Sequence, residues 1–281
     1  MTGAEPATED AGVRRIPLAT GIELADHEFG AGEPVLLLHA WSETHRSFQR
    51  LVPLLPRTWH LIVPDQRGVG DSVQPDRGYA LTDFAADTIG LLDALGLHSA
   101  WLVGTSSGGY VAQQVAVDHP SRVRGLVLIG SPADLQRPLP VALAEALDSF
   151  HDPVNRDDIG RLNTMLGGQD RIPADFLDDM DTAALTIPAP VWKEWLAELF
   201  AAQPPIRQGR ISRPTLLLWG GAEEVLPAEQ LDTLRAAIDE VTVRIYEGTG
   251  HLVLWEQPER VAADVTAFIG VSATSVPRPS S

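Results

Sequence analysis

Residues 100–112 read AWLVGTSSGGYVA, an apolar segment followed by a turn of small residues and the start of a second pattern. The segment 100–104 is almost wholly apolar, as expected of a strand whose two faces are both covered. Residues 107–119 are predicted to form a helix directly behind the turn. Ser106 therefore lies between a buried strand and a helix, with a glycine two residues to either side.

A serine in this position has the setting of a nucleophile. A tight turn projects its hydroxyl above the sheet, and small neighbours let the backbone pack closely. The following helix directs its N-terminal N–H groups at any negative charge that develops there. The pattern Gly104-Thr105-Ser106-Ser107-Gly108 therefore predicts that Ser106 is catalytic.

A serine nucleophile needs a base, and the chain has eight histidines. His251 closes a glycine-containing loop between a predicted late strand and a predicted terminal helix, and the glycines would let the loop carry the imidazole over the strand ends. His60, His98 and His119 lie at element boundaries and are expected to be structural or exposed. His251 is the predicted base.

The rest of the chain alternates between short apolar segments and helical patterns. Strands are predicted at 35–39, 61–64, 100–104, 123–130, 215–219 and 241–246, and helices at 81–95, 107–119, 228–238 and 258–268. Residues 15–20 and 22–29 are expected to pair as an antiparallel hairpin around Gly21. The alternation predicts an α/β fold with a mostly parallel sheet flanked by helices.

One long segment departs from this alternation. Residues 134–209 contain amphipathic segments and several prolines but no strand pattern, which predicts a helical cap inserted into a core of residues 13–133 and 210–271. Residues 1–12 and 272–281 are polar and lack apolar periodicity, so both ends are predicted to be disordered.

Composition limits the partners. The 281 residues are 44% hydrophobic and 21% charged, with a formal net charge of −17, which disfavours nucleic acid and anionic lipid surfaces. No secretory signal or membrane-spanning segment is apparent, so a cytoplasmic protein with a small-molecule substrate is expected. The oligomeric state stays open.

No cofactor and no metal are predicted. The chain has no cysteine, no H-E-x-x-H motif and no histidine pair at i, i+4. The glycine-containing segment at 65–72, DQRGVGDS, lacks the lysine of a phosphate-binding loop and is too short for a dinucleotide fingerprint. It is interpreted as a structural turn near the mouth of the active site.

Taken together, these motifs resemble the α/β-hydrolase superfamily, most closely its serine esterase and lactonase branch, with similarity also to cofactor-free haloperoxidases and C–C hydrolases. The resemblance covers roughly residues 13–133 and 210–270. It rests on the elbow around Ser106 and on LLLH at 36–39, DQRGVGDS at 65–72, PTLLLWG at 214–220, GTGH at 248–251 and EQPE at 256–259. The order serine, acid, histidine is that of the superfamily.

The resemblance also implies the remaining catalytic groups. Relatives usually carry an aspartate three residues after the glycine that here is Gly220, which selects Glu223 as the triad acid. Glu224 and Asp134 stay open as alternatives. The oxyanion donors would be the backbone N–H groups of Trp41 and Ser107, although Ala40 stands where relatives usually have glycine.

The implied activity is hydrolysis of a carboxylic ester or lactone through an acyl-enzyme. A serine, unlike an aspartate, does not suit epoxide or haloalkane substrates. Apolar side chains predicted to contact a medium-sized, largely apolar substrate are those of Trp41, Met165, Trp192 and Trp195. A C–C hydrolase or perhydrolase-like enzyme on the same triad is the alternative, and a non-catalytic ligand receptor is a third hypothesis.

Overall fold

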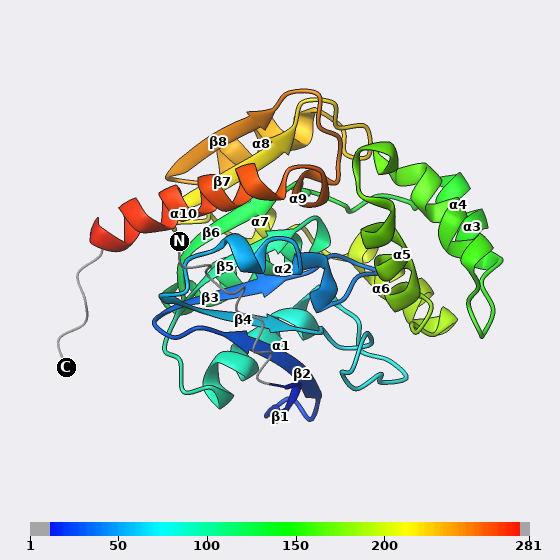
Figure 1. Cartoon of the computed structure of the whole chain (residues 1–281), viewed down its shortest axis with the longest axis horizontal. Coiled ribbons are helices and arrows are strands. Elements are labelled where there is room, and N and C mark those ends of the chain that lie inside the picture. Colours follow the sequence, from blue (N-terminus) through cyan, green and yellow to red (C-terminus); the bar gives the residue numbers. More distant parts are fainter. Residues whose placement is uncertain (1–11, 276–281) are drawn as a thin grey trace, which may run out of the picture.

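Eight strands form one sheet in the computed structural model, which describes residues 12–275 (Figure 1). Their order across the sheet is β1-β2-β4-β3-β5-β6-β7-β8. The bounds are β1 Arg14–Pro17, β2 Glu23–Phe29, β3 Glu33–Leu38, β4 Trp59–Pro64, β5 Ala100–Thr105, β6 Val123–Ile129, β7 Thr215–Gly220 and β8 Val241–Tyr246.

The pairing confirms the predicted α/β fold. Strands β3 to β8 are all parallel to one another, whereas the pairs β1–β2 and β2–β4 are antiparallel. Each of the six predicted core strands is present, and β1 and β2 form the predicted hairpin, with Gly21 at a φ of +83° in its turn. Because parallel strands end at the same edge, the loops after β3, β5, β7 and β8 meet there.

Helices cover both faces of this sheet (Figure 1). The bounds are α1 Leu81–Ala94, α2 Ser107–Asp118, α3 Val141–Asp148, α4 Arg156–Leu166, α5 Ala174–Ala184, α6 Ala189–Ala201, α7 Pro205–Gln208, α8 Glu229–Ala237, α9 Val253–Glu256 and α10 Pro258–Ser275. None of the helices within residues 12–275 is long and apolar enough to cross a bilayer.

The prediction of a disordered tail from residue 272 is wrong at its start. Helix α10 continues through Ser275, because residues 271–275 contain no glycine or proline and extend a helix that is already nucleated. Gly12 lies at the start of the described chain without regular structure. The remainder of both predicted disordered ends, 1–11 and 276–281, lies outside the described residues.

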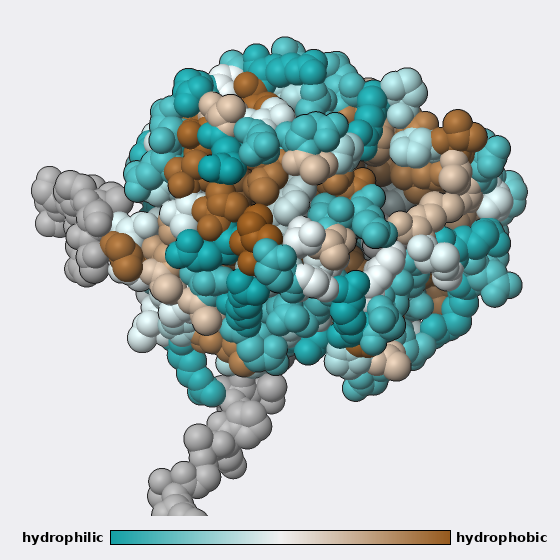
Figure 2. All heavy atoms as spheres, turned by 90° about the horizontal axis from the view of Figure 1, so that it is seen from above, coloured by the Kyte–Doolittle hydropathy of each residue, from teal (hydrophilic) through white to brown (hydrophobic). Residues whose placement is uncertain are grey.

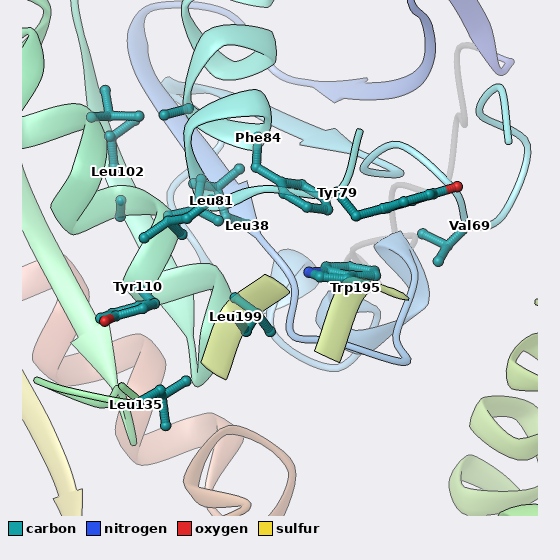
Figure 3. Close-up of a cluster of buried hydrophobic side chains, with 14 of the residues drawn as sticks. Leu38, Val69, Tyr79, Leu81, Phe84, Leu102, Tyr110, Leu135, Trp195 and Leu199 are labelled. Atoms are coloured by element: carbon teal, nitrogen blue, oxygen red, sulfur yellow. The ribbon is translucent and has the colours of Figure 1, made fainter. Parts of the chain in front are cut away.

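Two hydrophobic clusters explain why the central strands are apolar on both faces. In β3, Leu36 and Leu38 belong to the cluster that includes Phe84 of α1, whereas Val35 and Leu37 belong to the cluster that includes Val265 of α10. Alternate side chains of a strand point to opposite faces, so each face needs its own cover. Figure 3 shows the first of these clusters, with Leu38 near Phe84.

Helices α3 to α7 all lie between β6 and β7, and no strand occurs among residues 134–209. Figure 1 shows α3 to α6 beyond one end of the sheet. Trp195 of α6 is 1% exposed and stacks on Phe84 with ring centroids 4.7 Å apart. Figure 3 shows Trp195 among these core side chains. This packing attaches α6 to the core, and the substrate contact of Trp195 stays a prediction.

The surface carries the chain's charge. Seen from above the view of Figure 1, the molecule is largely hydrophilic, with brown apolar patches between the teal side chains (Figure 2). Individual exposed apolar residues include Val271 at 70% and Ile245 at 37%. Exposed apolar side chains are common on protein surfaces.

The segment at 65–72 is held by its own side chains. Asp65 accepts hydrogen bonds from the N–H groups of His45, at 2.7 Å, and Asp71, at 3.0 Å. Gly70 has a φ of +56°, and a Cβ there would lie 2.1 Å from the Asp65 carboxylate. The carboxylate fills the turn, consistent with a structural role rather than a phosphate cradle.

Arg67, in the same segment, ties it to α1. Its guanidinium forms two hydrogen bonds to Asp87, at 2.6 and 2.7 Å, and a third to the carbonyl of Gly78 at 2.6 Å. The two charged side chains are only 6% and 5% exposed. Removing one charge would leave the other buried without a partner, which is costly.

Replacing Asp87 with asparagine is expected to lower the free energy of unfolding by about 3–5 kcal/mol, since Arg67 would keep its charge in a dry site. Urea denaturation would measure the loss. Asp93→Asn is the matched control, because Asp93 is 63% exposed in its pair with Arg122 and should cost about 1 kcal/mol or less. Equal losses in the two variants would contradict the role given to burial.

Candidate active site

Ser106 occupies a strained turn between β5 and α2. Its φ of +46° and ψ of −119° lie outside the regions that side-chain-bearing residues usually adopt. The turn depends on close backbone approach, since a Cβ on Gly104 would lie 2.5 Å from Gly109 Cα and one on Gly108 would lie 2.2 Å from the carbonyl oxygen of Leu38. Close packing of α2 on the sheet thus leaves Ser106 at the strand ends.

His251 contacts both Ser106 and Glu223. Its Nε2 lies 3.1 Å from Ser106 Oγ, and its Nδ1 lies 2.7 Å from Glu223 Oε2. An ionised carboxylate only accepts hydrogen bonds, so Nδ1 carries the proton and Nε2 is left to accept the serine proton. The arrangement is that of a nucleophile, a base and a group that orients the base.

Glu223 is held as a carboxylate. Burial opposes its ionisation, but the hydrogen bond and charge of His251 and the N–H groups of Leu226 and Val225 outweigh it and keep the pKa of Glu223 below its usual value. The two N–H groups donate to Oε1 at 3.1 and 2.7 Å, which leaves Oε2 for the imidazole.

The two alternative acids lie elsewhere. Glu224 is exposed, and Asp134 forms an ion pair with Arg207 and accepts a hydrogen bond from the N–H of Gln136 at 2.8 Å. Of the three candidates, Glu223 is the one that the structure brings to His251. The extra methylene of a glutamate is accommodated by the turn that Val225 and Leu226 form around its other oxygen.

The loop after β3 brings the two predicted oxyanion donors together. Trp41 N–H donates to the Ser107 hydroxyl at 2.6 Å. Residues 40–43 form a turn in which Glu43 N–H donates to the Ala40 carbonyl at 3.2 Å, and Ser42 has a φ of +72°. The left-handed residue is thus Ser42 rather than Ala40, so alanine is tolerated at position 40.

Glu43 is a feature of this loop that the motifs did not single out. Its carboxylate accepts a hydrogen bond from Ala40 N–H at 3.0 Å. Burial raises the pKa of Glu43 to about 7, against the opposing effects of Ala40 N–H and of the charge of His251. The signal in the sequence that could have identified Glu43 is an acidic residue four positions after His39, where the predicted strand ends.

Aromatic side chains join this loop to α6. Trp41 Nε1–H donates to the carbonyl of Trp192 at 3.1 Å, and the two rings meet edge to face with centroids 5.1 Å apart. Phe150 also meets Trp192 edge to face, with ring centroids 5.4 Å apart. Met165 is 44% exposed on α4, and its substrate contact stays a prediction.

A histidine–aspartate group lies behind the same loop. Within residues 12–275, His27, His45 and Asp65 have potential ligand atoms within 4.8 Å of one another. The two imidazoles are stacked, with centroids 3.6 Å apart and planes 23° apart, so their in-plane lone pairs cannot converge well on one ion. His45 Nδ1 lies 2.8 Å from Asp65 Oδ1, and the group is best described as packing.

Comparisons with known proteins agree with this geometry. A model of the α/β-hydrolase fold matches residues 33–258. The chain is 29% identical over 273 residues to a 2-hydroxymuconate semialdehyde hydrolase of Pseudomonas sp. (strain CF600), covering 90% of this chain and 92% of that protein.

Two solved structures extend the similarity. A thermophilic esterase from Thermogutta terrifontis has a TM-score of 0.80 and 26% identity, covering 93% of this chain and 99% of the other. An N-acyl homoserine lactone degrading enzyme has a TM-score of 0.77 and 26% identity, covering 91% and 100%. The chain belongs to the α/β-hydrolase family, and it is a hydrolase.

If Glu223 orients His251, Glu223→Gln should reduce kcat on the order of 10³–10⁴-fold, because an amide no longer fixes the tautomer or stabilises the imidazolium. Steady-state hydrolysis of a p-nitrophenyl ester would measure it. Glu224→Gln removes the neighbouring exposed charge and should change kcat less than about twofold. A larger loss in Glu224→Gln than in Glu223→Gln would transfer the role to Glu224.

Proposed function

We propose that this protein is a serine hydrolase that cleaves a carboxylic ester or lactone through an acyl-enzyme. The observation that carries the proposal is the hydrogen-bonded series Ser106–His251–Glu223, at 3.1 and 2.7 Å. The chain order serine, acid, histidine and the strained turn at Ser106 support it.

In the proposed reaction, Ser106 Oγ attacks the carbonyl carbon while His251 Nε2 accepts the hydroxyl proton. Glu223 stabilises the imidazolium that results, and His251 then passes the proton to the leaving oxygen. The acyl-enzyme is hydrolysed by water that His251 activates in the same way. The N–H groups of Trp41 and Ser107 bind the oxyanion, and removal of one such donor typically costs about 3–4 kcal/mol.

Forming that oxyanion site requires one local change. The Ser107 hydroxyl now accepts the Trp41 N–H at 2.6 Å, where the substrate oxygen would lie. Rotation about the Cα–Cβ bond of Ser107 would free this donor without moving the backbone. The hydroxyl therefore satisfies the N–H group when no substrate is bound.

The proposed substrate is medium-sized, uncharged and largely apolar. Helices α3 to α7 would act as the cap over the strand ends, and the Trp41–Trp192 contact supports this because it joins α6 directly to the oxyanion loop. The aromatic rings of Trp41, Trp192 and Phe150 lie beside this loop and favour an apolar group.

C–C bond hydrolysis on the same triad is the second candidate. The similarity to the 2-hydroxymuconate semialdehyde hydrolase, which extends over 92% of that protein, favours it. The name of that relative denotes a carboxylate substrate. The similarity to the thermophilic esterase and to the N-acyl homoserine lactone degrading enzyme, each at 26% identity, favours ester or lactone hydrolysis, which is the preferred function.

The test compares substrates and the nucleophile together. The wild-type protein is expected to show a burst of p-nitrophenol from a medium-chain ester, to turn over lactones, and to be inactive on a vinylogous diketone that carries a carboxylate. Ser106→Ala should abolish the burst and lower kcat on the order of 10⁶-fold. A burst in Ser106→Ala would defeat the triad, and diketone cleavage faster than ester cleavage would select the second candidate.

A further inference from the structure

An arginine of the inserted segment reaches the loop that carries His251. The short 3-10 helix η4, Gln169–Arg171, lies between α4 and α5. The Arg171 guanidinium donates a hydrogen bond to the Gly248 carbonyl, and its Nη1 lies 3.1 Å from Glu256 Oε2. These two contacts lie on either side of His251 in the sequence.

Glu256 continues the contact toward His251. Its side chain is 1% exposed, and its Oε1 accepts a hydrogen bond from Gly250 N–H at 2.9 Å. Burial raises the pKa of Glu256, against the Gly250 hydrogen bond and the charge of Arg171, both of which favour the carboxylate. Arg171, in the inserted segment, thus helps to keep Glu256 ionised, and the ionised carboxylate accepts the hydrogen bond from Gly250.

Glycine backbone approaches the Glu256 carboxylate closely from two sides. Gly168 has a φ of +79°, and a Cβ there would lie 3.1 Å from Glu256 Oε1. A Cβ on Gly250 would lie 3.2 Å from the same oxygen. The carboxylate therefore lies between two glycine backbones, one from the inserted segment and one from the loop of the base.

An apolar contact adjoins the charged one. Phe176 of α5 meets Trp255 of α9 edge to face, with ring centroids 5.4 Å apart. Arg50 donates to the Trp255 carbonyl at 2.6 Å. Residues 255 and 256 are therefore in contact with the inserted segment through one aromatic pair and one ion pair.

We propose that Arg171 is a positioning residue for the catalytic base. Through Gly248 and Glu256, Arg171 holds the inserted segment against the loop that carries His251. The inference rests on the proposed serine hydrolase function. It makes the geometry of His251 depend on the inserted segment being seated. Movement of that segment away from the sheet would release the Gly248 carbonyl and leave Glu256 buried without its cation.

The test separates positioning from substrate binding. Arg171→Met should lower kcat for a p-nitrophenyl ester by about 10-fold to 100-fold, because small displacements of a catalytic group are costly, and should change KM less than about twofold. Glu256→Gln should lower kcat similarly. The double variant should lose no more than the worse single variant, since both remove one connected contact.

Two further measurements guard against a general loss of structure. Arg171→Lys keeps the positive charge but loses the forked donor, and should fall between wild type and Arg171→Met. Amide hydrogen exchange should quicken at residues 248–251 in Arg171→Met while that of the central strands stays unchanged.

Arg156→Met is the matched control. Arg156 pairs with Asp178 at 2.8 Å on the exposed surface of the inserted segment, so its removal should leave both kcat and KM at the wild-type values. A rise in KM without loss of kcat in Arg171→Met would make Arg171 a substrate contact and overturn the inference. Wild-type kcat in Arg171→Met would also overturn it, whatever the rates of exchange.

Different results would overturn the proposed hydrolase function and the positioning role of Arg171. A wild-type protein that forms no acyl-enzyme at Ser106 would overturn the proposed function and this inference with it. An active wild-type enzyme whose Arg171→Met variant keeps full kcat would overturn the positioning role alone.

Discussion

The strained turn at Ser106 is the constraint on which the site depends. A positive φ at a serine is tolerated because α2 packs against β5 and β3 closely enough to fix the turn, and glycines at 104 and 108 make that approach possible. The two hydrophobic clusters on either face of the sheet supply the packing. With Ser106 fixed, the site is completed by three loops at the same edge of the sheet. The loop after β3 carries an oxyanion donor, the loop after β7 the acid and the loop after β8 the base.

Much of this could be predicted from the sequence because it depends on local order. The periodicity of apolar residues and the positions of turn residues predicted the six parallel strands. The turn around Ser106 and the glycine-containing loop before His251 predicted the nucleophile and the base. Prediction of the triad acid depended on the family resemblance, because Glu223, Glu224 and Asp134 all carry a carboxylate and no local pattern distinguishes them. The structure brings Glu223 to His251 because the N–H groups of Val225 and Leu226 hold its other oxygen.

What sequence reasoning missed depends on contacts between distant segments. The aromatic pattern of α6 does not distinguish Trp192, which meets Trp41, from Trp195, which stacks on Phe84 in the core. Arg171 lies in a segment without a recognised motif, and its partner Glu256 is far along the chain. Glu43 also lies outside any recognised motif, although its partner, Ala40 N–H, is only three residues away. In α10, four polar or small residues, 272–275, continue a helix because the preceding turns are already formed.

In the proposed mechanism Ser106, with His251 and Glu223, attacks an acyl carbonyl whose oxygen binds to the N–H groups of Trp41 and Ser107. A crystal structure of the protein after reaction with an alkyl fluorophosphonate would show the nucleophile and the oxyanion site together. Phosphorus should be bonded to Ser106 Oγ, with a phosphoryl oxygen within hydrogen-bonding distance of the Trp41 and Ser107 N–H groups and the Ser107 hydroxyl turned away. An adduct on another residue, or a phosphoryl oxygen pointing away from both N–H groups, would contradict it.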